Sequence, residues 1–317
     1  MSLALLFSPQ GSQAVGMGRE LADASPEARD TFDTADRALG WSVSDLAWNG
    51  PEERLNDTRW TQPALLTTSV AALRALRSRV RLEPALLAGH SVGEYAALVA
   101  AGVLAFEDAL RLVARRGELM AAQAGGAMTA VIGLGRQEIQ HAIEAAASSA
   151  EVVVANDNAP GQVVLSGTSD GLAAVEEALQ KAGARRLIPL NVSGAFHSPH
   201  MARVGDALAD EFAQVEWRDA ETPVISNVTA EPVQEAARLR KLLAEQVRSP
   251  VEWVASIRRM VEEGVETFVE CGPAGTLSGM VRRIAPAART LQVADRASLG
   301  ETVAALLGAP AGASVRS

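Results

Sequence analysis

The stretch ALLAGHSVGEYAALVAAGVL, residues 85–104, decides the fold that this sequence predicts. It begins with four apolar residues, which are typical of a buried strand. Residues 94–101 are mostly good helix formers, and Gly102 is a residue that ends helices. Between the two lies Gly-His-Ser-Val-Gly, residues 89–93. The sequence therefore predicts a strand, a tight turn and a helix, with Ser91 in the turn.

The two glycines of this turn indicate a chemical role for Ser91. Glycine tolerates crowded backbones and unusual φ angles, so a sharp turn would hold the Ser91 hydroxyl out of the sheet. Amides at the start of the helix, including that of Val92, would point toward an oxyanion formed there. This pattern is typical of the nucleophile elbow in α/β-hydrolase-like sheets. The alternative is that Ser91 only caps the helix, because short motifs also occur by chance.

The composition is that of a soluble globular protein. The chain has 317 residues, 48% hydrophobic and 21% charged, enough to bury a substantial core. Its net charge of −9 argues against broad electrostatic binding to nucleic acid or to an anionic membrane. The single cysteine, Cys271, excludes an internal disulfide and is interpreted as a buried strand residue. Without a signal-peptide pattern or an apolar stretch of membrane-spanning length, we expect a cytoplasmic protein with a frayed tail from Gly308.

The rest of the chain predicts two domains. A large α/β-hydrolase-like domain with a parallel sheet comprises residues 1–125 and 193–317. Residues 126–192 alternate as β-α-β-β-α-β, which predicts an inserted ferredoxin-like domain. In the large domain, strands are expected at 3–7, 85–88, 222–227 and 266–271, and helices at 19–38, 64–79, 94–101, 106–120, 202–212, 236–247, 254–263 and 277–284. In the insert, strands are expected at 127–134, 151–158, 161–168 and 185–192, and helices at 136–149 and 169–184.

A serine nucleophile needs a base, and histidine is the usual one near neutral pH. Of the four histidines, His90 is expected to point away from the turn and His141 lies on a solvated helix face. His197 is preferred over His200, because it follows a run of small residues and precedes a helix. Between Ser91 and His197 no acidic residue stands at an obvious strand end, so a backbone carbonyl is an alternative partner for the imidazole.

The helix expected at 106–120 carries Arg115 and Arg116. A guanidinium group matches a carboxylate with two parallel hydrogen bonds, so one of this pair is a candidate carboxylate ligand. Taken alone, however, an arginine pair on a helix is usually solvated.

The order of motifs along nearly the whole chain resembles one family. It is similar to the malonyl-CoA:acyl-carrier-protein transacylases of type II fatty acid synthesis and to the related stand-alone acyltransferases of polyketide synthases. The motifs are Gln10-Gly11-Ser12-Gln13, Gly89-His90-Ser91-Val92-Gly93-Glu94-Tyr95, Arg116-Gly117, Asn156-Asp157-Asn158-Ala159-Pro160-Gly161-Gln162, Gly194-Ala195-Phe196-His197, Gln246 before Ser249-Pro250-Val251, and Glu270-Cys271-Gly272-Pro273.

The resemblance implies a ping-pong transfer of a malonyl group from malonyl-CoA to acyl carrier protein. Ser91 would be the acylated nucleophile, His197 its base, and Gln246 the residue whose main-chain carbonyl orients the histidine. No metal and no cofactor of its own is implied, because the partner carries the phosphopantetheine. A monomer is expected.

The resemblance also implies which groups bind the negative charges of the reaction. The amides of Gln10 and Val92 would form the oxyanion hole, and Arg116 would pair with the malonyl carboxylate. Arg116 distinguishes this hypothesis from a serine hydrolase acting on neutral esters or thioesters, which needs no cation. A third hypothesis is an inactive subunit that only docks carrier protein.

One turn departs from the family pattern. The family has Phe-Pro-Gly-Gln-Gly-Ser-Gln, whereas this chain has Ser8 and Pro9 before Gln10. Proline removes the amide at position 9 and leaves that of Gln10. Two basic pairs, Arg185-Arg186 and Arg282-Arg283, are candidate contacts for an acidic carrier protein, with solvated helix ends as the alternative.

Overall fold

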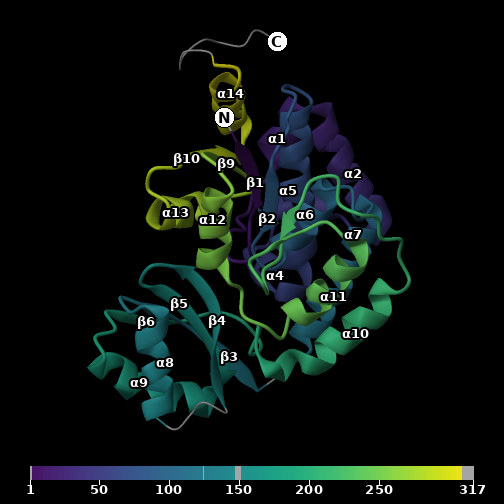
Figure 1. Cartoon of the computed structure of the whole chain (residues 1–317). Helices are drawn as coiled ribbons and strands as arrows, with labels where there is room; N and C mark the ends of the chain where they lie inside the picture. The colour runs from purple at the N-terminus through teal and green to yellow at the C-terminus, as the bar shows by residue number, and fades with distance from the viewer. Residues whose placement is uncertain (1, 124, 147–150, 309–317) are drawn as a thin grey trace.

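The computed structural model describes residues 2–123, 125–146 and 151–308, and it shows an α/β protein built on two separate sheets (Figure 1). The larger part contains a six-stranded sheet between two layers of helices. The smaller part, at the lower left of Figure 1, contains a four-stranded sheet and two helices. The end of the helix predicted at 136–149 and the tail after Gly308 lie outside the described residues.

The large sheet is mixed. Its strands are β1 (Leu3–Phe7), β2 (Leu86–Gly89), β7 (Val224–Ile225), β8 (Pro232–Val233), β9 (Thr267–Cys271) and β10 (Arg289–Val293), in the spatial order β10-β9-β1-β2-β7-β8. Neighbours from β10 to β7 are parallel, but β8 runs antiparallel to β7. The prediction of a parallel sheet is therefore wrong at this edge, because residues 226–231 turn the chain straight back beside β7.

Helices cover both faces of this sheet. They are α1 (Arg19–Ala24), α2 (Pro26–Leu39), α3 (Val43–Asn49), α4 (Glu52–Asn56), α5 (Thr58–Arg77), α6 (Gly93–Ala100), α7 (Phe106–Ala121), α10 (Ala202–Phe212), α11 (Ala236–Gln246), α12 (Trp253–Glu262), α13 (Thr276–Ile284) and α14 (Arg296–Leu306), with a 3₁₀ turn η1 (Pro199–Met201). In β1, Leu5 and Phe7 join the core with α2, α5 and α7, whereas Ala4 and Leu6 join the core with α12 and α13. Burial on both faces explains why β1 is apolar at every position.

The second sheet lies within one continuous segment of the chain. Its elements are β3 (Gly126–Ile132), α8 (Arg136–Ala145), β4 (Val152–Ala159), β5 (Gln162–Thr168), α9 (Ser169–Lys181) and β6 (Arg186–Pro189). The strands lie in the order β4-β5-β3-β6 with antiparallel neighbours, and the part has its own hydrophobic core. A parallel bridge between Asn156 and Val251, and an ion pair between Arg136 and Glu252, join it to the larger part.

Several predicted elements differ in extent from the observed ones. The helix predicted at 19–38 is two helices, because Ser25 interrupts it and caps α2 with Pro26 at the first helical position. The helix predicted from residue 64 begins at Thr58, where Asp57 caps it, and it contains Pro63. The strand predicted at 222–227 is reduced to β7. Sequence analysis missed α3, α4, η1, β8, β10 and α14.

In the part of the chain that the structure describes, every helix is too short or too polar to cross a bilayer.

Candidate active site

Ser91 lies in a strained turn between β2 and α6. Its φ angle is +52°, in the left-handed region that non-glycine residues rarely adopt. A Cβ on Gly89 would lie 1.9 Å from the Gly93 carbonyl, and one on Gly93 would lie 2.2 Å from the Phe7 carbonyl oxygen. Asn227 holds both sides of the turn, since its Oδ1 accepts from the Ser91 amide at 2.7 Å and its Nδ2 donates to the Gly89 carbonyl at 2.7 Å. The glycines are therefore a steric requirement of the turn.

His197 lies directly against the serine hydroxyl. Its Nε2 is 2.8 Å from Ser91 Oγ, and its Nδ1 is 2.9 Å from the carbonyl oxygen of Gln246 and 3.3 Å from that of Ser249. A carbonyl accepts only, so Nδ1 carries the proton and Nε2 is free to accept the serine proton. Burial, reinforced by the nearby Arg116, lowers the pKa of His197 to about 3, so the imidazole is neutral near pH 7. Backbone carbonyls therefore occupy the place of a triad acid.

Only one residue of the arginine pair reaches the serine. Arg116 is 1% exposed, and its Nη2 donates to Ser91 Oγ at 3.1 Å and to Gln246 Oε1 at 3.0 Å. Its Nη1 donates to Gln62 Oε1 at 2.6 Å, while its Nε is buried and has no hydrogen-bond partner among residues 2–123, 125–146 and 151–308. Arg115 is exposed and pairs with two surface glutamates. The structure thus places one cation, fully buried, beside the candidate nucleophile.

The turn after β1 lies against the elbow and presents Gln10. Among the described residues, no acceptor is found for the backbone amides of Gln10 and Val92. The turn is anchored by Gln10 Nε2, which donates to Thr58 Oγ1 at 2.9 Å, and by Ser8 Oγ, which donates to Glu270 Oε1 at 3.0 Å. The proline at position 9 therefore sits in a turn that hydrogen bonds hold on both sides, and the Gln10 amide is available to a ligand.

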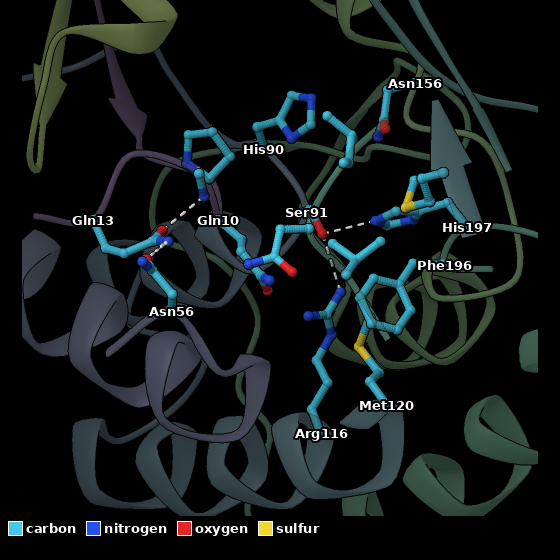
Figure 2. A pocket seen from close by; sticks show the side chains of 16 residues that line it. Gln10, Gln13, Asn56, His90, Ser91, Arg116, Met120, Asn156, Phe196 and His197 are labelled. Atoms are coloured by element: carbon cyan, nitrogen blue, oxygen red, sulfur yellow. Dashed lines mark hydrogen bonds between the residues drawn. The ribbon is translucent and has the colours of Figure 1, made fainter. Parts of the chain in front are cut away.

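These groups line one cavity of about 370 Å³, a size typical of small-molecule sites. Figure 2 shows Ser91 in the middle, His197 and Phe196 on one side, Gln10 and Gln13 on the other, and Arg116 with Met120 below. The lining residues are Pro9, Gln10, Gly11, Gln13, Asn56, His90, Ser91, Arg116, Met120, Met128, Asn156, Leu190, Asn191, Val192, Phe196 and His197.

His90 also lines the cavity, but its imidazole is directed to another partner than Ser91, as expected. Its Nε2 is 2.8 Å from Asn158 Oδ1. Its ring packs against Trp253, and burial lowers its pKa to about 4. Both His141 and His200 are exposed.

The sequence model of the acyl transferase domain matches residues 4–302, which include every group described above. The chain belongs to the acyl transferase family. The resemblance seen in the sequence motifs is thereby confirmed, and so is the expectation of an acyltransferase enzyme.

Relatives of this acyl transferase are similar over almost their full lengths. The malonyl CoA-acyl carrier protein transacylase of Bacillus subtilis is 43% identical over 297 residues, which are 92% of this chain and 93% of the relative. That of Escherichia coli K12 is 42% identical over 284 residues, 89% of this chain and 92% of the relative.

Solved structures show the same architecture. An acyl carrier protein S-malonyltransferase from Vibrio cholerae has a TM-score of 0.91 and 40% identity, covering 94% of this chain and 99% of that one. A malonyl-transacylase in complex with AntF, a type II polyketide synthase acyl-carrier protein, has a TM-score of 0.92 and 39% identity, covering 97% and 100%.

Sequence reasoning missed three residues that support the site of this acyl transferase: Gln62, Glu94 and Asn227. Glu94 is 2% exposed, and its Oε2 accepts from Gln246 Nε2 at 2.6 Å. The same Nε2 donates to the Ser91 carbonyl at 3.0 Å, so the Gln246 side chain also holds the elbow. Glu94 adjoins the Ser91 motif in sequence, whereas nothing local to Gln62 or Asn227 signals a role.

Proposed function

We propose that this acyl transferase moves a malonyl group from malonyl-CoA to the phosphopantetheine thiol of an acyl carrier protein. The observation that carries the proposal is the buried guanidinium of Arg116, 3.1 Å from Ser91 Oγ. A malonyl thioester has its carboxylate two carbons from the reacting carbonyl, so the cationic partner of that carboxylate must lie close to the nucleophile. The names of the relatives agree with this substrate and acceptor.

In the first half-reaction, Ser91 Oγ attacks the thioester carbonyl while His197 Nε2 takes the serine proton. The amides of Gln10 and Val92 donate to the oxyanion of the tetrahedral intermediate. The C–S bond then breaks, and the CoA thiolate receives the proton from His197. The product is a malonyl ester on Ser91 with His197 neutral again.

The second half-reaction reverses these steps with a new thiol. His197 Nε2 takes the proton of the phosphopantetheine thiol, and the sulfur attacks the ester carbonyl in the same oxyanion site. When the C–O bond breaks, Ser91 Oγ recovers the proton from His197. The ping-pong scheme needs no cofactor of the protein's own, since the acceptor arrives on the partner. The carbonyl of Gln246 keeps His197 in the tautomer that both steps require.

A serine hydrolase built on the same elbow would use Ser91 and His197 alike. Burial of an unpaired cation costs several kcal/mol, and a neutral ester would not use it. Arg116 therefore favours a substrate with a free carboxylate. An inactive docking subunit would have no need of the 2.8 Å contact between Ser91 and His197.

Intact-protein mass spectrometry after mixing with malonyl-CoA tests the proposal. We expect a malonyl adduct on the wild type that maps to Ser91, is absent from Ser91→Ala, and disappears on addition of carrier protein with malonyl-carrier protein as product. Loss of the adduct to water at the same rate with or without carrier protein would instead identify a hydrolase. Failure of any adduct to form would refute both.

We also propose domain boundaries, a fold for each domain and an oligomeric state. We interpret residues 1–125 and 193–317 as an α/β-hydrolase-like domain, supported by the strand, Ser91 turn and helix around β2. Residues 126–192 are interpreted as a ferredoxin-like insert, supported by the order β3-α8-β4-β5-α9-β6 and the strand order β4-β5-β3-β6. A monomer is the proposed active form, since one chain supplies all the side chains of the scheme.

A further inference from the structure

Arg116 is a buried cation, and none of the described carboxylates is in direct contact with it. Its described hydrogen-bond partners are the neutral oxygens of Gln62, Gln246 and Ser91. Its guanidinium also lies 5.8 Å from the ring centroid of Tyr95. Removing a charge from water without compensation is costly, so a counter-charge is expected nearby.

In the part of the chain that the structure describes, the carboxylate that acts on Arg116 is that of Glu94, one side chain away. Gln246 lies between the two, with Oε1 accepting from Arg116 Nη2 at 3.0 Å and Nε2 donating to Glu94 Oε2 at 2.6 Å. Gln246 is fully buried, so its amide has no water to turn toward. The carboxylate on one side and the guanidinium on the other fix which end of the amide faces which group.

We propose that Glu94 is the resident counter-charge of Arg116, held one amide away so that the guanidinium stays charged yet free for the carboxylate of the acyl group. The inference rests on the proposed function and extends it to the control of acyl selectivity. A carboxylate bonded directly to Arg116 would occupy the donors that the substrate needs. Placed beyond Gln246, Glu94 attracts the cation without blocking it.

Substrate binding then sets two carboxylates in competition for one cation. The titratable groups that face Glu94 in the described part of the chain are Arg116 on α7 and Tyr95 on α6, and its other contacts, Gln246 and Asn227, are neutral. Burial raises the pKa of Glu94 to about 7. A second negative charge beside Arg116 raises that pKa further, so malonyl-CoA should bind with uptake of a proton near pH 7.

The test measures equilibrium binding in the Ser91→Ala background, where no acyl group can transfer. The ratio of dissociation constants, acetyl-CoA over malonyl-CoA, isolates the carboxylate, because both ligands share the CoA moiety. Glu94→Gln keeps the shape and one acceptor oxygen but removes the charge. We expect the ratio to rise by about tenfold, the order of the repulsion between two carboxylates roughly 12 Å apart, on opposite sides of the guanidinium, at an effective dielectric constant of about 20.

Glu252→Gln is the control. Glu252 is a partly buried carboxylate, but its ion pair is with Arg136 of the smaller part. Its substitution should leave the binding ratio unchanged. Circular dichroism establishes that both variants are folded.

Proton uptake on malonyl-CoA binding supplies a second readout, independent of the ratio of dissociation constants. Calorimetry of malonyl-CoA binding at pH 7 in two buffers of different ionisation enthalpy should reveal proton uptake in Ser91→Ala, with acetyl-CoA as the baseline, and none in Ser91→Ala/Glu94→Gln. An unchanged or lower binding ratio in Glu94→Gln, or no uptake in Ser91→Ala, overturns the inference. If the dissociation constants of acetyl-CoA and malonyl-CoA are nearly equal in Ser91→Ala itself, where Arg116 is intact, the proposed function is refuted instead.

Discussion

Truncation of Arg116 gives the most direct measure of the proposed selectivity. Removal of one partner from a buried, hydrogen-bonded charge pair costs about 2–5 kcal/mol. Arg116 is 1% exposed, so water screens the pair little. Since each 1.4 kcal/mol is a factor of ten, Arg116→Ala should lower kcat/KM for malonyl-CoA roughly 30-fold to 5,000-fold.

The structure also predicts that Arg116→Ala lowers the transfer of malonyl and acetyl groups alike, by a smaller factor. Arg116 donates to Ser91 Oγ and to the Gln246 side chain, so its loss disturbs the nucleophile whatever the acyl group. Acetyl-CoA, which has no carboxylate, reports this shared part. Acetyl transfer should therefore gain relative to malonyl transfer. Arg116→Lys should restore only part of the malonyl activity, because an ammonium group lacks the planar fork that also contacts Gln62.

Steady-state kinetics with both acyl-CoA substrates tests this reasoning in wild type, Arg116→Ala, Arg116→Lys and Arg115→Ala. Arg115 is a matched control, since it is the adjacent arginine of α7 and its ion pairs are solvent exposed. The Arg115→Ala substitution should leave kcat/KM for malonyl-CoA and for acetyl-CoA within about twofold of the wild-type values, as expected for loss of a surface ion pair. A parallel fall of malonyl and acetyl activity in Arg116→Ala would show that Arg116 is structural and would refute a carboxylate-binding role.

Three further predictions follow from the site and its surface. Ser91→Ala should abolish malonyl exchange and keep the wild-type circular dichroism spectrum; exchange near the wild-type rate would remove Ser91 from the mechanism. Because the pKa of His197 is lowered from 6.5 to about 3 in the folded state, the unfolded state takes the proton first as pH falls. The free energy of unfolding should therefore decrease from about pH 6.5 toward pH 3, and His197→Gln should remove that part of the decrease in a series of thermal melts; identical pH slopes would contradict it. KM for an acidic carrier protein should rise with salt and with charge reversal of Arg185-Arg186, while free pantetheine kinetics stay flat. Arg282-Arg283 is the weaker candidate, since Arg283 donates to Gln162 and to the Pro160 carbonyl within the protein. Equal salt dependence with both acceptors would place the docking surface elsewhere.

Short sequence patterns predicted those elements whose structure depends mainly on residues close together in the chain. The turn at Ser91 was predictable because the crowding that demands Gly89 and Gly93 arises within a few residues and from the strand beside them. The alternation of strands and helices in residues 126–192 was predictable for the same reason, since short apolar runs and helix caps identify each element.

Elements at the edges of the fold were less predictable. Strand β10 is half-exposed and carries polar residues, so it has no strong apolar signal, and it forms because β9 offers a free edge. Strand β8 has only two residues and exists only where β7 pairs with it. Each of these strands forms because another strand pairs with it. The sequence of the strand itself contains no information about that partner, so a pattern within one segment does not predict it.

The sequence by itself determined the elbow, the candidate serine and the restriction of the base to a few histidines. The family resemblance implied Arg116 and the Gln246 carbonyl, but the residues alone left Arg115 and an acidic partner of His197 open, and the tertiary contacts distinguish these alternatives. Only the tertiary structure shows that Glu94 and Gln246 meet behind the guanidinium. The reason is distance along the chain. Ser91 and Gln246 are 155 positions apart, and only the packing of α7 and α11 beside β2 and α6 brings their atoms within hydrogen-bonding reach.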